Sequence, residues 1–480
     1  MGDTMNQLKT PLYQALKEHI KINPISLHVP GHKNGELLKG EPLFQQVLKM
    51  DVTELSNLDD LHSPEGAIRE AERLLADAYK AERSFFLING STVGNLAMIM
   101  AALQEGDIAF IQRNSHKSVL NGIELTKAQP ILLGPDYVEG WDVAGGVSLE
   151  TVKEAYFLYP NCKAIILTYP NYYGMTYELK EIIDFAHRKQ IPVLVDEAHG
   201  AHFIGGEVFP PSAIELGADV VVQSAHKTLP AMTMGSFLHV NSEHISIETV
   251  NHFLRILQSS SPSYPIMASL DLARRYISTY TIEDQEYLRK AIELFRNELT
   301  ALKQIKVLEF PNGIGDVLKL TLQSQCGYSG YELQSLLEKR GVYTEMADPK
   351  NVLLVLPLLK RDMPFFFDEI IKRIKEALSN ITTREIYSSS FTYFKKAAVS
   401  TISTYENQSI KELPITEATN YLCGETIIPY PPGIPLLLPG EKITDEDIQG
   451  LISLMRSGAR FQGGEGLKEG KIKVFLQNGG

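Results

Sequence analysis

Short apolar segments alternate with helical patterns between about residues 80 and 240, and this alternation constrains the fold most strongly. Amphipathic stretches such as LKEIIDFAHRKQ (179–190) separate the apolar segments. Strands that alternate with helices form a largely parallel sheet. We therefore predict an α/β fold with its reactive groups at the carboxyl ends of the strands. The apolar segments are SFFLI (84–88), IAFI (108–111), AIILT (164–168), PVLV (192–195), VVVQ (220–223) and SFLHV (236–240).

The chain has 480 residues, which is more than one hydrophobic core usually serves, so several domains are expected. A long charged helix is predicted over 278–303, and VYTEM (342–346) predicts a strand that ends near Glu345. The expected parts are an N-terminal arm (1–60), a large domain (61–280), a small α/β domain (281–385) and a C-terminal domain (386–480) with a proline-rich turn at 429–435.

The formal net charge of −12 argues against a nucleic-acid partner and is compatible with a cationic small molecule. No apolar run is long enough to span a bilayer, and the N-terminus lacks the apolar core of a signal peptide. We therefore expect a cytoplasmic protein without a membrane partner. The three cysteines are far apart and form no CxxC pair, which indicates a reducing compartment: Cys162, Cys326 and Cys423.

A lysine follows the predicted strand at 220–223, within the segment Ser224-Ala225-His226-Lys227-Thr228. A lysine at the carboxyl end of a strand can condense with an aldehyde to form a Schiff base. By itself the segment also fits a surface lysine at the start of a loop. Lys227 becomes a candidate only together with the other motifs.

An acid ends the fully apolar strand in the segment PVLVDEAHG (192–200). The Asp196 carboxylate can pair with a protonated pyridine nitrogen, and Ala198 is small enough for a flat ring to lie against the backbone. A helicase DEAH box would need a phosphate loop of the form GxxxxGK[ST], and the chain has none. An acid that caps a helix after a strand remains a structural alternative.

Two further turns follow predicted strands. In NGSTVGN (89–95), small residues, free helix amides and the hydroxyls of Ser91 and Thr92 can hold a phosphate. In RNSHKS (113–118), His116 can stack on a cofactor ring, although an exposed loop histidine would fit the pattern too. No metal site is predicted, since the pairs His28/His32 and His199/His202 lack an HExxH motif or a Cys/His cluster.

Together these motifs resemble the fold-type I pyridoxal-phosphate enzymes, and within them the class-I ornithine/lysine/arginine decarboxylases. The resemblance covers almost the whole chain, and the proline-rich segment discriminates best because aminotransferases do not normally carry it. The matching segments are HVPGHKNG (28–35), LDDLHSPEGAI (58–68), FFLINGSTVGN (85–95), RNSHKS (113–118), VDEAHGAHF (195–203), SAHKTLPAMTMGS (224–236) and IPYPPGIPLLLPGE (428–441).

The resemblance implies a mainly parallel seven-stranded sheet, pyridoxal 5'-phosphate as cofactor and a role for each matching residue. Lys227 would carry the Schiff base, Asp196 would face the ring nitrogen and His116 would stack on the ring. The chain is similar to the short Gram-positive-type members, which implies a homodimer whose sites are completed by the partner. The implied cofactor-binding set also includes Ser91, Thr92, Ala198, His199, Ser224 and His226.

The implied reaction is decarboxylation of a basic amino acid to a polyamine-type amine and carbon dioxide. The short architecture favours arginine, then lysine or ornithine, although no motif separates them. Acids that could hold the distal cation are Glu345, Asp59, Asp60 and Glu425, and each also fits a solvated surface acid. The alternatives are another fold-type I activity, such as an aminotransferase or a carbon–sulfur lyase, and a non-catalytic regulatory or binding protein.

Overall fold

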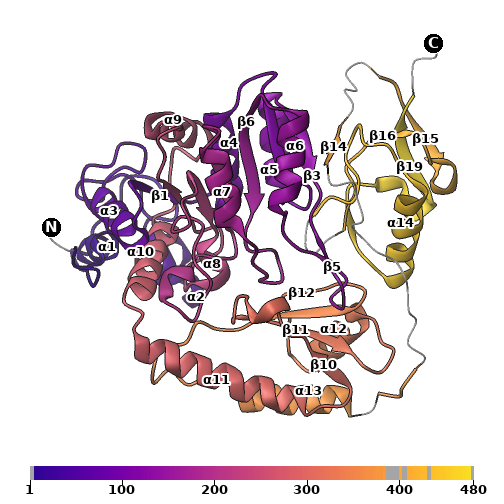
Figure 1. Cartoon of the computed structure of the whole chain (residues 1–480). Coiled ribbons are helices and arrows are strands. Elements are labelled where there is room, and N and C mark those ends of the chain that lie inside the picture. The colour runs from indigo at the N-terminus through magenta and orange to yellow at the C-terminus, as the bar shows by residue number, and fades with distance from the viewer. Residues whose placement is uncertain (1–4, 380, 385–398, 403–407, 430–433, 477–480) are drawn as a thin grey trace.

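The computed structural model describes residues 5–379, 381–384, 399–402, 408–429 and 434–476. An eight-stranded sheet lies at its centre, in the order β1-β9-β8-β7-β6-β2-β3-β14 (Figure 1). The strands are β1 (Arg83–Leu87), β2 (Ile108–Gln112), β3 (Gln129–Leu133), β6 (Cys162–Thr168), β7 (Val193–Asp196), β8 (Val220–Gln223), β9 (Ser236–Val240) and β14 (Val399–Thr401).

The predicted α/β class with a mainly parallel sheet is confirmed. Strands β8, β7, β6, β2 and β3 run parallel, whereas β9 is antiparallel to β8 and β1, and β14 is antiparallel to β3. Seven strands come from the predicted large domain, and β14 adds an eighth that was not predicted. All six apolar segments form strands, but β3 was missed because only its last three residues are buried.

Both faces of the sheet are buried, because successive side chains of a strand point to opposite sides. In β6, Ile165 and Leu167 join one core cluster, whereas Ala164 and Ile166 join another. The first cluster is covered by α3 (Ala67–Tyr79), α6 (Leu149–Leu158), α7 (Leu179–His187) and α10 (Tyr264–Ser278). The second is covered by α4 (Gly90–Ala102), α5 (Lys117–Thr126) and α9 (Ile247–Leu257).

The N-terminal segment carries α1 (Pro11–Lys21) and α2 (Pro42–Met50). Leu12 and Leu16 of α1 are fully buried against the large domain. By contrast, the segment from the end of α1 through α2 exposes many large apolar side chains. Ile25 and Leu27 are 92% exposed, and Leu43 is 93% exposed. Clusters of exposed apolar side chains are typical of interaction surfaces and of ligand-binding grooves.

The small domain begins with α11 (Ile282–Thr300), within the predicted helical connector. Its antiparallel sheet has the order β10-β11-β13-β12, with α12 (Gly330–Glu338) and α13 (Phe367–Leu378) beside it (Figure 1). These strands are β10 (Ile305–Val307), β11 (Lys319–Ser324), β12 (Met346–Ala347) and β13 (Asn351–Val355).

The strand predicted over 342–346 is wrong in its position. Strand β12 begins only at Met346, and Glu345 directly precedes it. The backbone N–H of Val342 donates to the carbonyl of Leu337, so the start of the predicted strand still belongs to the end of α12.

The C-terminal segment has a core of its own beneath a three-stranded antiparallel sheet and α14 (Asp445–Ser457). Its strands are β15 (Ile410–Pro414), β16 (Leu422–Cys423) and β19 (Lys471–Phe475), with the short pair β17 (Ile428–Pro429) and β18 (Phe461–Gln462). Residues 430–433 of the proline-rich turn lie outside the described residues. The remaining elements are β4 (Tyr137–Val138), β5 (Val143–Ala144), α8 (Ala225–Thr228) and 3-10 turns at Glu36–Leu38, Phe203–Gly205, Pro311–Gly313, Ile415–Glu417 and Glu465–Glu469.

Candidate active site

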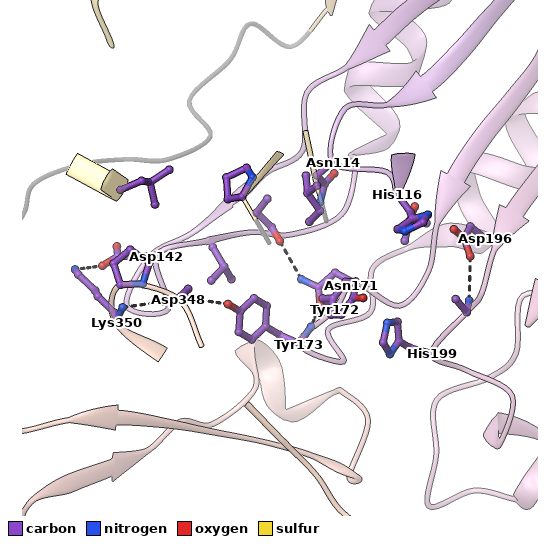
Figure 2. Close-up of a pocket in the computed structure, with 18 of the residues that line it drawn as sticks. Asn114, His116, Asp142, Asn171, Tyr172, Tyr173, Asp196, His199, Asp348 and Lys350 are labelled. Carbon is purple, nitrogen blue, oxygen red and sulfur yellow. Dashed lines mark hydrogen bonds and ion pairs between the residues drawn. The ribbon is translucent and has the colours of Figure 1, made fainter. Parts of the chain in front are cut away.

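One pocket brings together residues from all three folded parts of the chain (Figure 2). The carboxyl ends of β6 and β7 and the start of α5 form one end, and the small and C-terminal domains supply further walls. Of the residues predicted from the sequence, six line it: Ser91, His116, Asp196, Ala198, His199 and Lys227.

Lys227 lies in the short helix α8, just after β8. Its Nζ lies 3.0 Å from His199 Nε2 and 5.2 Å from the centre of the Tyr172 ring. Burial lowers the pKa of Lys227 to about 8, and the positive charge of Lys319 acts in the same direction. The negative charge of Asp196 opposes this shift. Lys227 therefore exists partly as a free amine, the form that can attack a carbonyl, near neutral pH.

Asp196 is the last residue of β7 and is 2% exposed. The Asn95 amide donates to Oδ2 over 2.9 Å, and the backbone N–H of Ala198 donates to Oδ1 over 3.2 Å. The carboxylate is thus held in one orientation at the end of the strand. Asn95 was not among the predicted residues, although it lies in the predicted phosphate turn.

His116 caps the N-terminus of α5. Its Nδ1 accepts the backbone N–H of Ser118 over 3.2 Å and lies 2.9 Å from the Ser118 hydroxyl, which itself accepts from Asn95. Since Nδ1 acts as acceptor, the proton of the neutral ring belongs on Nε2. Burial lowers the pKa of His116, which favours this neutral form.

The helix α4 approaches the sheet closely at its start. A Cβ on Gly94 would lie 2.7 Å from the Leu87 side chain and 2.8 Å from that of Val222, so only glycine fits there. Asn89, the residue just before α4, makes no side-chain hydrogen bond that caps the helix. The first amides of α4 therefore point out at the end of the sheet, as in anion-binding helix starts.

Three hydroxyl and imidazole groups of the predicted phosphate set lie in different surroundings. The Ser224 hydroxyl donates to Ser91 Oγ over 2.8 Å, which joins the start of α8 to the start of α4. His226 Nδ1 lies 3.1 Å from the carbonyl of Gly235. Thr92 is exposed on the first turn of α4. Thr92, Ser224 and His226 do not line the pocket.

The two histidines of the DEAHGAH segment (196–202) both contact the small domain. His199 Nδ1 lies 3.0 Å from Lys319 Nζ, and His202 Nε2 lies 2.8 Å from Asp316 Oδ1. Lys319 was not predicted as a site residue, because it begins a strand in another domain. Tyr172 was not predicted either, although its position just after β6 places it at the carboxyl end of a parallel strand, where reactive groups collect.

The four predicted substrate acids do not gather in the pocket. Asp59 Oδ2 accepts the backbone N–H of Gly66 and Ile68, so this carboxylate organises the start of α3. Asp60 accepts the N–H of His62, and Glu425 accepts the N–H of Lys473 in the C-terminal segment. Glu345 is exposed and does not line the pocket, but its charge acts on Lys227.

Two acids that were not predicted lie at the end of the pocket opposite Asp196 (Figure 2). Asp142 is ion-paired with Lys350. Asp348 accepts the Tyr173 hydroxyl and the backbone N–H of Lys350, and burial raises its pKa.

The donor set fits pyridoxal phosphate, since one pocket presents an amine, a fixed carboxylate, a small residue and the uncapped start of a helix. Among the described residues, no group of three or more His, Cys, Asp and Glu side chains is placed to hold a metal ion. None of the described helices has both the length and the apolar character needed to cross a membrane.

Comparison with known families agrees with this geometry. Residues 10–314 match the major domain of Orn/Lys/Arg decarboxylases, and residues 381–465 match their C-terminal domain. The chain belongs to the Orn/Lys/Arg decarboxylase family. The family predicted from the sequence motifs is therefore confirmed.

Two Bacillus subtilis relatives of this decarboxylase-family chain match over nearly their full length. The chain is 46% identical to the uncharacterized protein YaaO of Bacillus subtilis, covering 98% of this chain and 99% of YaaO. It is 31% identical to an arginine decarboxylase of the same organism, over 98% and 99% of the two chains. The crystal structure of a Francisella novicida lysine decarboxylase is similar in fold, with a TM-score of 0.81 and 20% identity over 98% of this chain and 81% of that one.

Proposed function

We propose that this protein is a pyridoxal-phosphate-dependent decarboxylase of a basic amino acid, with arginine as the first candidate and lysine or ornithine next. The observation that carries the proposal is the meeting of Lys227, Asp196 and His116 in one pocket of an Orn/Lys/Arg decarboxylase-family chain. The likeness to an arginine decarboxylase of B. subtilis supports arginine.

The cofactor, held on Lys227, would supply an aldehyde that reacts with the substrate amine and a ring that accepts the electron pair left on the α-carbon when carbon dioxide departs. The chain's own residues do the rest. Asp196 presents a fixed negative charge for a protonated ring nitrogen. The start of α4, with Ser91 and Ser224, offers hydrogen bonds to a phosphate. His116 would lie against the ring.

Two groups of the chain can return a proton to the α-carbon of the substrate. Lys227 Nζ gains and loses a proton near neutral pH, so it has the proton affinity that general acid catalysis requires there. His116 can act only in its protonated form, which burial disfavours. The walls of the pocket hold the substrate in place, which is the main contribution of the protein in such a reaction.

Glu345 is our candidate for the partner of the substrate's distal cation. It is exposed on the single chain and does not line the pocket, but its charge opposes the lowering of the pKa of both Lys227 and Lys319. A carboxylate in this place can hold either a guanidinium or an ammonium group.

The direct test is release of carbon dioxide from a panel of amino acids by the purified protein. We expect release from arginine, lysine or ornithine and none from acidic or apolar amino acids. The absorbance of the loaded protein should show a visible band. If no basic amino acid releases carbon dioxide, the proposal fails, and transfer of the amino group to an oxo acid would be measured next.

A further inference from the structure

His199 lies between two lysines that come from different domains. Its Nε2 is 3.0 Å from Lys227 Nζ, and its Nδ1 is 3.0 Å from Lys319 Nζ. Lys319 is 3% exposed at the start of β11, and His199 is likewise buried. The three side chains thus form a continuous chain of contacts from the small domain to Lys227.

The numbers of hydrogen-bond donors and acceptors on these three groups limit how many of them can carry a positive charge. A neutral imidazole offers one N–H donor and one acceptor nitrogen, whereas an ammonium group offers donors only. If both lysines were charged, one ammonium would face the N–H of His199. A charged His199 is disfavoured, because burial and both lysines hold its pKa well below the usual range. One of the two lysines must therefore be a neutral amine.

The charged groups around the pair favour Lys319 as the ammonium. Asp316 lies three residues before Lys319, and its Oδ2 is buried without a hydrogen-bond partner among the described residues. Lys227 faces Asp196, His116, His226 and Glu345, and Glu345 acts on both lysines. Both carboxylate oxygens of Asp196 already accept hydrogen bonds, from the Asn95 amide and from the backbone N–H of Ala198. The other oxygen of Asp316, Oδ1, lies 2.8 Å from His202 Nε2.

From this geometry we infer that Lys319 is a positioning residue that keeps Lys227 in the amine form through His199. The Lys319 ammonium donates to His199 Nδ1, and the His199 Nε2–H then donates to the lone pair of Lys227. The inference rests on the proposed function only in the use made of Lys227, since the amine form is the one that attacks a carbonyl.

The loop after β6 holds Lys319 in place. A Cβ on Gly174 would lie 2.6 Å from Lys319 Cγ and 2.9 Å from Asp316 Cβ, so the loop backbone packs directly on the lysine stem. The carbonyl of Gly174 accepts the backbone N–H of Asp316 over 2.8 Å. These contacts fix Lys319 without using its ammonium group, which leaves that group for His199.

Replacement of Lys319 by Met tests the inference, because Met has a similar length without the charge. The readout is acetylation of Lys227 by trace acetic anhydride in the cofactor-free full chain, followed by mass spectrometry from pH 6 to pH 10. Loss of a nearby positive charge raises the pKa of Lys227. We expect the labelling midpoint to rise by about one pH unit, which is about tenfold less labelling at neutral pH.

A second variant, Asp316→Asn, keeps the shape of the buried carboxylate and removes its charge. Loss of a negative charge would directly lower the pKa of Lys227. If Lys319 acts through His199, however, the loss first lowers the pKa of Lys319, which then carries less positive charge. The pH midpoint for labelling of Lys227 should therefore rise. The matched control is Lys360→Met, which removes another small-domain lysine whose Nζ donates to Thr279, away from the pocket. The control should leave the midpoint unchanged.

The pH midpoint of the visible band of the loaded protein gives an independent readout and should move in the same variants. Unchanged midpoints in folded Lys319→Met and Asp316→Asn proteins would overturn the inference. If Lys319→Met does not fold, the direction seen in Asp316→Asn decides. The labelling needs neither cofactor nor substrate, so its result stands apart from whether the protein decarboxylates basic amino acids.

Discussion

The guanidinium of Arg113 lies 2.7 Å from the carboxylate of Glu441, although 328 residues separate them in the chain. Both side chains are almost fully buried. Arg113 also donates to the carbonyls of Pro435 and Leu436, at the end of the proline-rich segment. The turn that carries His116 therefore also holds the C-terminal segment against the pocket, where Ile434 forms part of the wall.

Glu441→Gln should destabilise the protein, because it leaves the buried guanidinium of Arg113 without its ionic partner. Breaking a buried pair in this way costs about 3 kcal/mol. Urea unfolding would measure the loss, and limited proteolysis should cut the C-terminal segment faster. Glu298→Gln is the control, since its pair with Lys375 is on the surface and should contribute little. Equal stability of the two variants would contradict the anchoring role.

Borohydride reduction of the purified yellow protein should fix the cofactor on Lys227. Its lowered pKa and its place in the pocket make Lys227 the most reactive amine toward an aldehyde. Peptide mapping by mass spectrometry locates the label, and Lys227→Ala should carry none. A label on Lys117, Lys33 or Lys319 would show that the assignment is wrong.

Asp196→Ala should lose far more activity than cofactor content. The carboxylate acts on the stability of charge in the ring, whereas the start of α4 and the bond to Lys227 supply most of the binding. Turnover and bound cofactor, measured on the same preparation, give the two numbers. Near-normal turnover would mean that another group faces the ring nitrogen.

The protein should be a homodimer in solution. Ile25, Leu27 and Leu43 expose 92–93% of their surface on the single chain, and a second copy is the expected cover for this patch. The double variant Leu27→Asp/Leu43→Asp should weaken the dimer and reduce activity, because the family resemblance implies that each site is completed by the partner. Light scattering measures the mass. A fully active monomer would refute the prediction.

Glu345→Gln should lower kcat/KM for the basic substrate by roughly 10- to 1000-fold, because the cation loses its charged partner. An uncharged analogue of similar length should lose much less, since it never used that charge. Glu425→Gln is the control, as its carboxylate serves the backbone of Lys473. Equal losses for charged and uncharged analogues would make Glu345 structural, and Asp142 and Asp348 would be tested next.

The sequence determined the features that depend on local periodicity and on strand ends. The apolar segments of the large domain predicted its strands, because a strand buried on both faces is apolar at every position. The places of Asp196 and Lys227 followed from the rule that parallel strands present their carboxyl ends at one edge of the sheet. For Asp196 and Lys227, the position after a strand in the sequence is therefore enough to place both side chains at the same edge of the sheet.

Only the tertiary structure decided which distant residues complete the pocket. Lys319 meets His199 across 120 positions, and Glu441 meets Arg113 across 328, so no local pattern links either pair. The same limit applies to the substrate acids. In the sequence, Asp59 and Glu345 are both acids in non-helical segments, and only the structure shows that the Asp59 carboxylate already accepts backbone N–H groups. A side chain's role depends on which partners the folded chain brings within a few ångströms, and the packing of separate domains sets those partners.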